Sequence, residues 1–268
     1  MLNNTLIVIA AGLSSRMNGM PKHLCKINDK FNIVNTIEKT TNYFDNIYVV
    51  LNNKLSDEFK NITEKCLENF NNVKIIYINS GLGDADAILK TIKYLEDNNL
   101  YDVNSEYIYC WGDAYFKSST PFKEMLPYNA NYFETPLFVG VSVDEDPYAW
   151  FDVVDNKIVF SYFKRTHGNN LFGVHDQCIF KTNNKIFKCL LLTYAKYLGF
   201  DGENYTNSDN NEMGLLNFIT WLANTYDTLC DDYYAHTIYV TKNNVISFNT
   251  KEELENLNLM LKNESCSN

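Results

Sequence analysis

The sequence is poor in the features that mark secreted, zinc-binding and membrane proteins. Its seven cysteines are an odd number and none forms a CxxC pair, so neither a disulfide framework nor a zinc site is indicated. No apolar run reaches the ~18 residues of a membrane span, and the first residues lack the pattern of a signal peptide. We therefore expect a soluble, cytoplasmic protein that has no membrane partner.

Basic residues are fewer than acidic ones: the chain has 23 Lys and Arg but 33 Asp and Glu, which gives a formal charge of −10. Nucleic-acid affinity rests on cations that neutralise phosphates, so no nucleic-acid partner is expected and any phosphate binding must be local. Apart from a general richness in asparagine, we find no linker, repeat or low-complexity segment. A chain of 268 residues can bury one sizeable core, which predicts a single domain.

The first half alternates between strand-like and helix-like patterns. Apolar runs that predict strands lie at 6–10, 46–51, 73–79 and 106–111. Helical spacing between them, as in 55–70 and 87–95, is typical of a parallel sheet covered by helices.

The second half predicts a different arrangement. Asp155 and Asn156 separate two strand-like runs and favour a hairpin appended to the sheet. Thr250 and Glu253 have the spacing of a capping box for a last helix. Other strands are expected within 133–143 and 174–180 and on both sides of 242–244, and helices at 183–198 and about 211–225.

The first strand runs into a turn of very small residues. Ala10, Ala11 and Gly12 leave the backbone N–H groups open to an anion, and Gly12 is expected to supply the positive φ of a concave turn. Ser14 and Ser15 then suit a helix start, whose N-terminus favours negative charge.

Two cations flank this turn. Arg16 and Lys22 would add full positive charges around an anion, and Pro21 would stiffen the approach to Lys22. The plain alternative is the first loop of any α/β domain, with both cations solvated. Neither the P-loop pattern nor the GxGxxG dinucleotide pattern is present.

A second motif is the pair Gly112 and Asp113, at the end of the apolar strand at 106–111. Ligands bind beyond the carboxyl ends of strands in open α/β sheets, and a carboxylate there suits Mg²⁺. The alternative is an ordinary turn after a strand. Asp113 is predicted to lie two strands along the sheet from the small-residue turn.

These motifs resemble the signature of nucleotidyltransferases that activate sugar phosphates and related compounds, a group of sugar-phosphate nucleotidylyltransferases, cytidylyltransferases and MobA-like NTP transferases. The resemblance implies a Rossmann-like, GT-A-like α/β fold: a mixed, mostly parallel sheet flanked by helices, with an appended β-hairpin acceptor region. It also implies a nucleotide-binding half at 1–120, an acceptor-binding half at 121–248 and a C-terminal helix at 249–268. The residues that match the triphosphate-holding motif are Ala10, Ala11, Gly12, Arg16, Pro21 and Lys22.

The resemblance assigns further roles. Asp113 matches the main metal ligand, and Asn211 and Glu212 stand near where some members take a second one, unless they only cap a helix. Lys164 would hold the phosphate of the acceptor, although exposed cations at strand ends are common.

The loop at 80–88 matches the part that contacts the nucleobase. Gly81 would allow close approach of the backbone, and Asp84 stands where uridyltransferases usually have a small hydroxyl residue. Asp84 and Asp86 could instead cap the following helix and favour its first turn. We prefer this second reading for Asp86 and leave Asp84 open.

The implied reaction is Mg²⁺-dependent transfer of CMP or UMP from a nucleoside triphosphate to a small phosphorylated acceptor such as a sugar phosphate, with release of pyrophosphate. The acceptor phosphate is itself the nucleophile, so orientation and charge neutralisation would supply the catalysis.

Three alternatives remain. The acceptor could be an amine-bearing phosphate or phosphonate, because aromatic residues cluster near the carboxylates at 144–146 and both kinds of group attract amines. The aromatic residues of this cluster are Trp111, Tyr115, Tyr148, Trp150 and Phe151. Gly173, His175 and Asp176 are expected to line the pocket in which Lys164 and Arg165 would hold the phosphate of the acceptor. The chain could also be a catalytically inactive nucleotide-binding regulatory protein. A glycosyltransferase would normally show an Asp-x-Asp motif, which is absent at Asp113.

Overall fold

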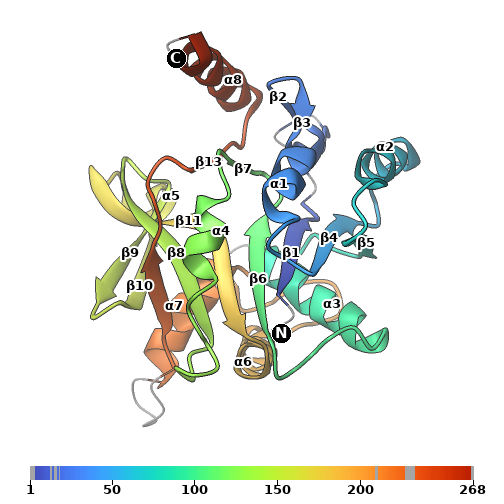
Figure 1. Cartoon of the computed structure of the whole chain (residues 1–268). Helices are drawn as coiled ribbons and strands as arrows, with labels where there is room; N and C mark the ends of the chain where they lie inside the picture. Colours follow the sequence, from blue (N-terminus) through green and yellow to red (C-terminus); the bar gives the residue numbers. More distant parts are fainter. Residues whose placement is uncertain are drawn as a thin grey trace.

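One mixed sheet of nine strands forms the centre of the described chain, in the order β5-β4-β1-β6-β11-β8-β12-β10-β9 (Figure 1). The computed structural model describes residues 4–12, 14, 17, 19–208, 211–226 and 233–266. The four strands of the first half are parallel, which confirms their prediction. They are β1 (Thr5–Ala10), β4 (Asn46–Asn52), β5 (Val73–Ile78) and β6 (Glu106–Trp111).

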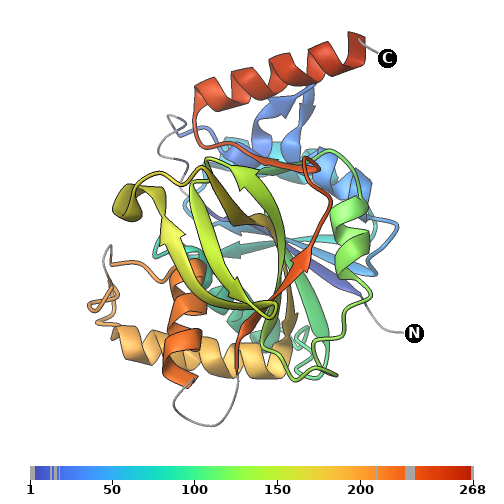
Figure 2. The ribbon, with the colours of Figure 1, turned by 90° about the vertical axis from the view of Figure 1, so that its left-hand side faces the viewer.

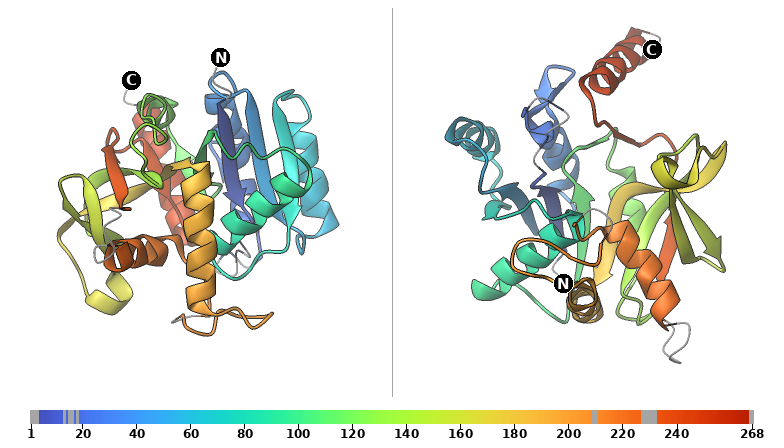
Figure 3. Two further views of the ribbon diagram at one scale, coloured as in Figure 1. Left: turned by 90° about the horizontal axis from the view of Figure 1, so that it is seen from below. Right: turned by 180° about the vertical axis from the view of Figure 1, so that it is seen from behind.

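Strand β1 is buried on both faces, because its side chains alternate between two apolar cores. Leu6 and Val8 belong to one core and Ile7 and Ile9 to the other, so helices cover the sheet from both sides (Figure 3). The first core includes α1 (Asn32–Thr40), α2 (Asp57–Leu67) and α4 (Thr120–Met125). The second includes α3 (Asp84–Asp97), α6 (Asn184–Leu198) and α7 (Leu215–Tyr226).

The strand order corrects one prediction about the site. Strand β6, which precedes Asp113, pairs directly with β1 and does not lie two strands away. After β1, the strands β4 and β5 are added on one side of β1, and β6 is then added on its other side. Open α/β sheets bind ligands where the strand order reverses in this way, so the two motifs meet at the expected crevice.

The second half extends the same sheet with mainly antiparallel pairs. The hairpin at Asp155 and Asn156 is confirmed, with φ values of 49° and 61° as a two-residue type I′ turn requires. Val174 of β11 pairs with Phe151 of β9, so the extension curls back on itself (Figure 2). Its strands are β8 (Leu137–Glu145), β9 (Ala149–Val154), β10 (Lys157–Phe163), β11 (Phe172–Asn183) and β12 (Ala235–Tyr239).

The C-terminal helix α8 (Lys251–Cys266) packs on the N-terminal part of the chain (Figure 2). The side-chain amide of Asn258 donates to the carbonyl of Lys26 at 3.1 Å. The capping box is confirmed, since Glu253 N–H donates to Thr250 Oγ1 and Thr250 N–H to Glu253 Oε2, both at 3.2 Å. The small elements nearby are η2 (Lys22–Leu24), β2 (Lys26–Ile27), β3 (Lys30–Phe31), β7 (Ala114–Phe116) and β13 (Val245–Ser247), with α5 (Lys164–His167) elsewhere.

None of the helices within the described residues is both long enough and apolar enough to cross a bilayer.

Candidate functional site

A cavity of about 540 Å³ opens at the carboxyl ends of β1 and β6. The end of β1 and the start of η2 line one side of it, and β9 and β11 line the other. The loop before α3 and the segment before α7, which contact each other, also belong to the lining. Most of the candidate residues share this cavity. Those that line it are Ala10, Gly12, Lys22, Gly81, Asp84, Asp113 and Glu212.

The two strand ends at the cavity floor approach each other closely because Gly112 has no side chain. Its N–H donates to the carbonyl of Ile9 at 2.8 Å, and a Cβ at this position would lie 2.6 Å from the Cβ of Ala10. Packing therefore requires glycine at position 112. The close approach that it allows brings Asp113, the next residue, beside the small-residue turn.

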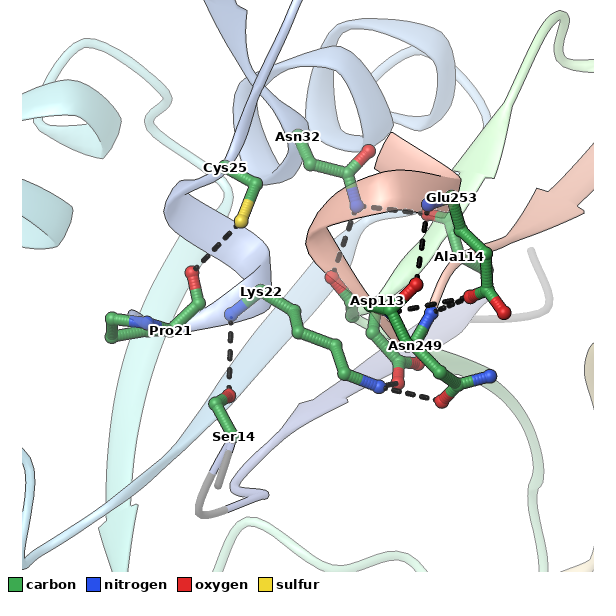
Figure 4. Close-up of polar contacts among 11 residues, drawn as sticks. Ser14, Pro21, Lys22, Cys25, Asn32, Asp113, Ala114, Asn249 and Glu253 are labelled. Carbon is green, nitrogen blue, oxygen red and sulfur yellow. Dashed lines mark hydrogen bonds and ion pairs between the residues drawn. The ribbon is translucent and has the colours of Figure 1, made fainter. Parts of the chain in front are cut away.

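Asn32, the first residue of α1, holds the turn that carries Asp113 (Figure 4). Its fully buried amide donates to the carbonyl of Gly112 at 3.1 Å and to the carbonyl of Ala114 at 3.0 Å. Both neighbours of Asp113 are thus fixed to a helix of the core. Asn32 was not predicted from the sequence, where it was one of many asparagines.

Lys22 joins three segments that are far apart in the sequence (Figure 4). Its ammonium lies 2.6 Å from Oδ2 of Asp113 and 2.9 Å from Oδ1 of Asn249. The backbone N–H of Lys22 donates to Oγ of Ser14 at 3.3 Å. The Lys22 side chain is 15% exposed and that of Asp113 is 37% exposed, so the pair lies partly screened at the cavity wall.

Asn249 is the functional candidate that sequence reasoning missed. It lies just before α8 and lines the cavity. Its side-chain oxygen accepts a hydrogen bond from the Lys22 ammonium, which also contacts Asp113. The sequence predicts this position only as the start of the C-terminal helix. Asn211, one of the two residues predicted as a second metal ligand, does not line the cavity, whereas Glu212 does.

The small-residue turn is fixed by Asn52, whose amide donates to the carbonyls of Ala11 at 3.0 Å and Ser80 at 3.2 Å. A Cβ on Gly12 would meet no atom within 4 Å, which leaves its backbone open to a ligand. The expected positive φ at Gly12 is wrong, whereas Ser14, among the described residues of this turn, has φ of 50°. Ser15 and Arg16 lie outside the described residues.

The loop before α3 is locked against the segment before α7. Gly83 has φ of 102°, and a Cβ there would lie 2.4 Å from the carbonyl oxygen of Met213. Gly83 occupies the N-cap position, so Asp84 is not the cap of α3. Instead, Oδ1 of Asp84 accepts the N–H groups of Ala85 at 2.8 Å and Leu215 at 2.7 Å. Burial raises the pKa of this carboxyl to about 6, although the hydrogen bonds oppose the rise.

Asp86 has a structural environment. It is buried within the first turn of α3, as preferred from the sequence, and its carboxylate accepts from Lys90 at 2.7 Å and from the Tyr205 hydroxyl at 3.0 Å.

Lys164 does not lie at the cavity. It begins α5 and its ammonium contacts both carboxylate oxygens of Asp146 at 2.7 Å. His175 and Asp176 do line the cavity, as expected for the start of β11.

The oxygen atoms of Asp113 and Asn249 are the hard ligands that Mg²⁺ prefers. Within the described ranges, no three His, Cys, Asp or Glu side chains gather into a metal-binding group. The residues present therefore fit an ion held by one carboxylate and one amide oxygen, with phosphates and water as its other ligands.

Comparison with known proteins supports the resemblance. Residues 6–97 match the family profile described as the MobA-like NTP transferase domain. No curated protein sequence matches the chain.

Solved structures share the fold over nearly the whole chain. A nucleoside-diphosphate-sugar pyrophosphorylase from Vibrio cholerae has a TM-score of 0.68 at 13% identity, over 95% of this chain and 99% of its own. An inositol-1-phosphate CTP transferase from T. maritima has a TM-score of 0.66 at 17% identity, covering 97% and 96%. A CTP:phosphocholine cytidylyltransferase from Streptococcus pneumoniae has a TM-score of 0.65 at 14% identity, covering 97% and 100%. The chain thus has the mixed α/β fold of nucleotidyltransferases.

Proposed function

We propose that the protein is a Mg²⁺-dependent nucleotidyltransferase that transfers a nucleoside monophosphate to a small phosphorylated acceptor and releases pyrophosphate. The observation that carries the proposal is the position of Lys22, whose ammonium contacts Asp113 and Asn249 at the edge of the cavity. This arrangement combines an open backbone turn, a fixed cation and two oxygen ligands, which a triphosphate and its metal ion require.

The chain's own groups would bind and orient the nucleotide. The backbone beside Gly12 is open to the phosphates, and Lys22 supplies a positive charge that is already fixed by its two partners. Arg16 is proposed as a second cation. The loop at Gly81 and Asp84 would take the nucleobase. A fixed cation stabilises charge that develops on the phosphates during transfer without further reorganisation.

Asp113 and Asn249 are the residues that would hold Mg²⁺, with Glu212 farther along the cavity wall and Asn211 outside it. The bound ion would neutralise phosphate charge and help to align the α-phosphate with the attacking acceptor oxygen.

The proposed donor is CTP or UTP. The two similar structures whose names mention CTP support testing CTP first. A sugar phosphate is the acceptor that the resemblance implies, and its phosphate would supply the nucleophile. Lys164 is a weak candidate for holding that phosphate, because Asp146 already binds it.

The proposal is tested by incubating the full chain with Mg²⁺, each of the four nucleoside triphosphates and a panel of phosphorylated acceptors, and measuring pyrophosphate. We expect release with at least one pair, and loss of more than about 99% of it in Asp113→Asn. The matched control is Asp97→Asn, since Asp97 is an exposed carboxylate that also pairs with a lysine. Tight nucleotide binding without turnover for every pair would contradict the proposal and favour a regulatory nucleotide-binding protein.

A further inference from the structure

The two walls of the cavity differ in charge. Lys22 stands on the nucleotide side, where phosphates are proposed to bind. Among the other described residues that line the cavity there is no Lys or Arg. The carboxylate of Asp176 lies on the opposite wall, and those of Asp84 and Glu212 lie on the adjoining lining, at the start of α3 and in the segment before α7. A second substrate that carried only negative charge would meet repulsion on this wall.

Asp176 is the strongest sign of a missing positive charge. The residue is 9% exposed and lines the cavity. Among the described residues its hydrogen-bond partner is the backbone N–H of Cys178, 3.3 Å from Oδ2, and no Lys, Arg or His pairs with it. A buried carboxylate without a cation is costly, so a ligand that brought a positive charge would gain strongly from it.

The backbone of β11 directs Asp176 to this position. The pairing of β11 with β8 shifts between Asp176 and Phe180, and Cys178 has φ of 56° within that bulge. A bulge changes the direction in which the side chains of a strand point and is common beside active sites.

Four other groups near this wall, Lys164, Asp146, Asp144 and His175, have partners other than Asp176. Lys164 contacts both oxygens of Asp146, and Asp144 accepts a hydrogen bond from Gln177 at 2.9 Å. His175, the one described imidazole of this wall, lies 3.6 Å from Asp144 through its Nδ1. None of them neutralises Asp176.

Two aromatic residues, on β6 and next to β9, also line the cavity. Tyr148 is 54% exposed and lines the cavity, as does Trp111. Their ring faces attract cations, most strongly where water is partly excluded. In contrast, Tyr115, Trp150 and Phe151 are buried and do not line the cavity, so two of the five aromatic residues expected near the acceptor lie there.

We propose that the acceptor is an amino-alkyl phosphate or phosphonate whose ammonium group binds Asp176 beside Tyr148 while its phosphate or phosphonate faces Lys22. This inference rests on the proposed nucleotidyltransferase function and names its acceptor class. It replaces the sugar phosphate, which carries only negative charge, with a substrate that is negative at one end and positive at the other.

The test compares acceptors that differ only in the charge of one end, with Mg²⁺ and CTP or UTP. O-phosphoethanolamine is paired with propyl phosphate, 2-aminoethylphosphonate is paired with propylphosphonate, and glucose 1-phosphate is included. We expect kcat/KM for the better of the two amines to exceed that of the matched propyl compound, which lacks the ammonium group, by about 30-fold or more, as a buried charge pair allows. Equal rates within each pair, or preference for glucose 1-phosphate, would overturn the inference and leave the nucleotidyltransferase proposal standing. Absence of pyrophosphate with every pair would overturn both.

Variants locate the ammonium site. Asp176→Asn should raise KM for the amine by about tenfold and leave KM for the nucleotide within about twofold. The control is Asp152→Asn, on β9 outside the cavity, where an exposed carboxylate accepts from Tyr162. Tyr148→Leu, at an exposed position, provides a second variant that does not disturb the core. Unchanged KM for the amine in both cavity variants would overturn the assignment.

Discussion

The ammonium of Lys22 lies 2.9 Å from Oδ1 of Asn249, although 227 residues separate the two in the chain. This contact joins the first loop of the protein to the segment that begins its last helix. Because Asp113 binds the same ammonium, the start, the middle and the end of the chain meet at the edge of the cavity.

Lys22→Met should lower kcat for nucleotidyl transfer by about 100-fold or more, because it removes the fixed cation at the phosphates. Asn249→Ala should lower it by about tenfold, since one oxygen partner is lost. The measurement is pyrophosphate release with the best substrate pair. Lys26→Met, which removes an exposed lysine from the adjacent strand β2, should have little effect. Equal effects of Lys22→Met and Lys26→Met would exclude a specific role for Lys22.

Asn32→Ala should destabilise the protein by about 1–3 kcal/mol, because the buried carbonyls of Gly112 and Ala114 lose their donor. Since these carbonyls flank Asp113, kcat should fall as well. Chemical unfolding and pyrophosphate release measure the two effects. In the control Asn35→Ala, on the same helix, a single long hydrogen bond of 3.5 Å is lost, so both effects should be small.

Gly83→Ala should destabilise the protein well beyond 1 kcal/mol, because the new Cβ would meet the Met213 backbone in addition to a strained φ. Gly202→Ala is the matched control. Its φ of 108° is similar, but a Cβ there meets nothing within 4 Å. The difference between the two changes in the free energy of unfolding isolates the steric contact. If both variants are equally stable, the two loops are not locked together as described.

His23 should make the protein less stable in mild acid. It is 2% exposed, and burial lowers its pKa from 6.5 to about 4. Thr63 donates its hydroxyl proton to the Phe59 carbonyl, so Nε2 of His23 donates to Thr63. The unfolded chain binds a proton near pH 6.5 and the folded chain only near pH 4. Stability is therefore lost as the pH falls through this window, by about 3 kcal/mol in total.

The measurement is the free energy of unfolding at pH 7.5 and at pH 4.5. His23→Gln should remove this part of the pH dependence, because an amide does not titrate. His167→Gln replaces an exposed imidazole and should retain it. An identical pH dependence in the wild type and His23→Gln would contradict the assignment to His23.

Much of the fold could be predicted from local patterns. The parallel strands were visible as apolar runs because both faces of each strand are buried, and the hairpin at Asp155 and Asn156 was visible because its residues tolerate positive φ. Gly112 and Asp113 were likewise recognisable, since a small residue and a carboxylate follow a buried strand.

Residues that act across the chain could not be predicted in the same way. Asn32, Asn52 and Asn249 each fix a distant segment through a side-chain amide, and their type and spacing resemble those of ordinary surface asparagines. For Lys164 the sequence predicted a role that the fold does not support. Its position after a strand suggested a phosphate ligand, but its ammonium is paired with Asp146.

By itself the sequence determined the class of fold and the two motifs at the strand ends, because backbone openness, strand burial and charge are local properties. Only the tertiary structure decided that β6 lies beside β1, that Asn249 joins Lys22 and Asp113, and that Asp176 lines the opposite wall among described residues that offer it no cation. Strand order and side-chain proximity depend on how distant segments pack, and a linear pattern does not record that packing.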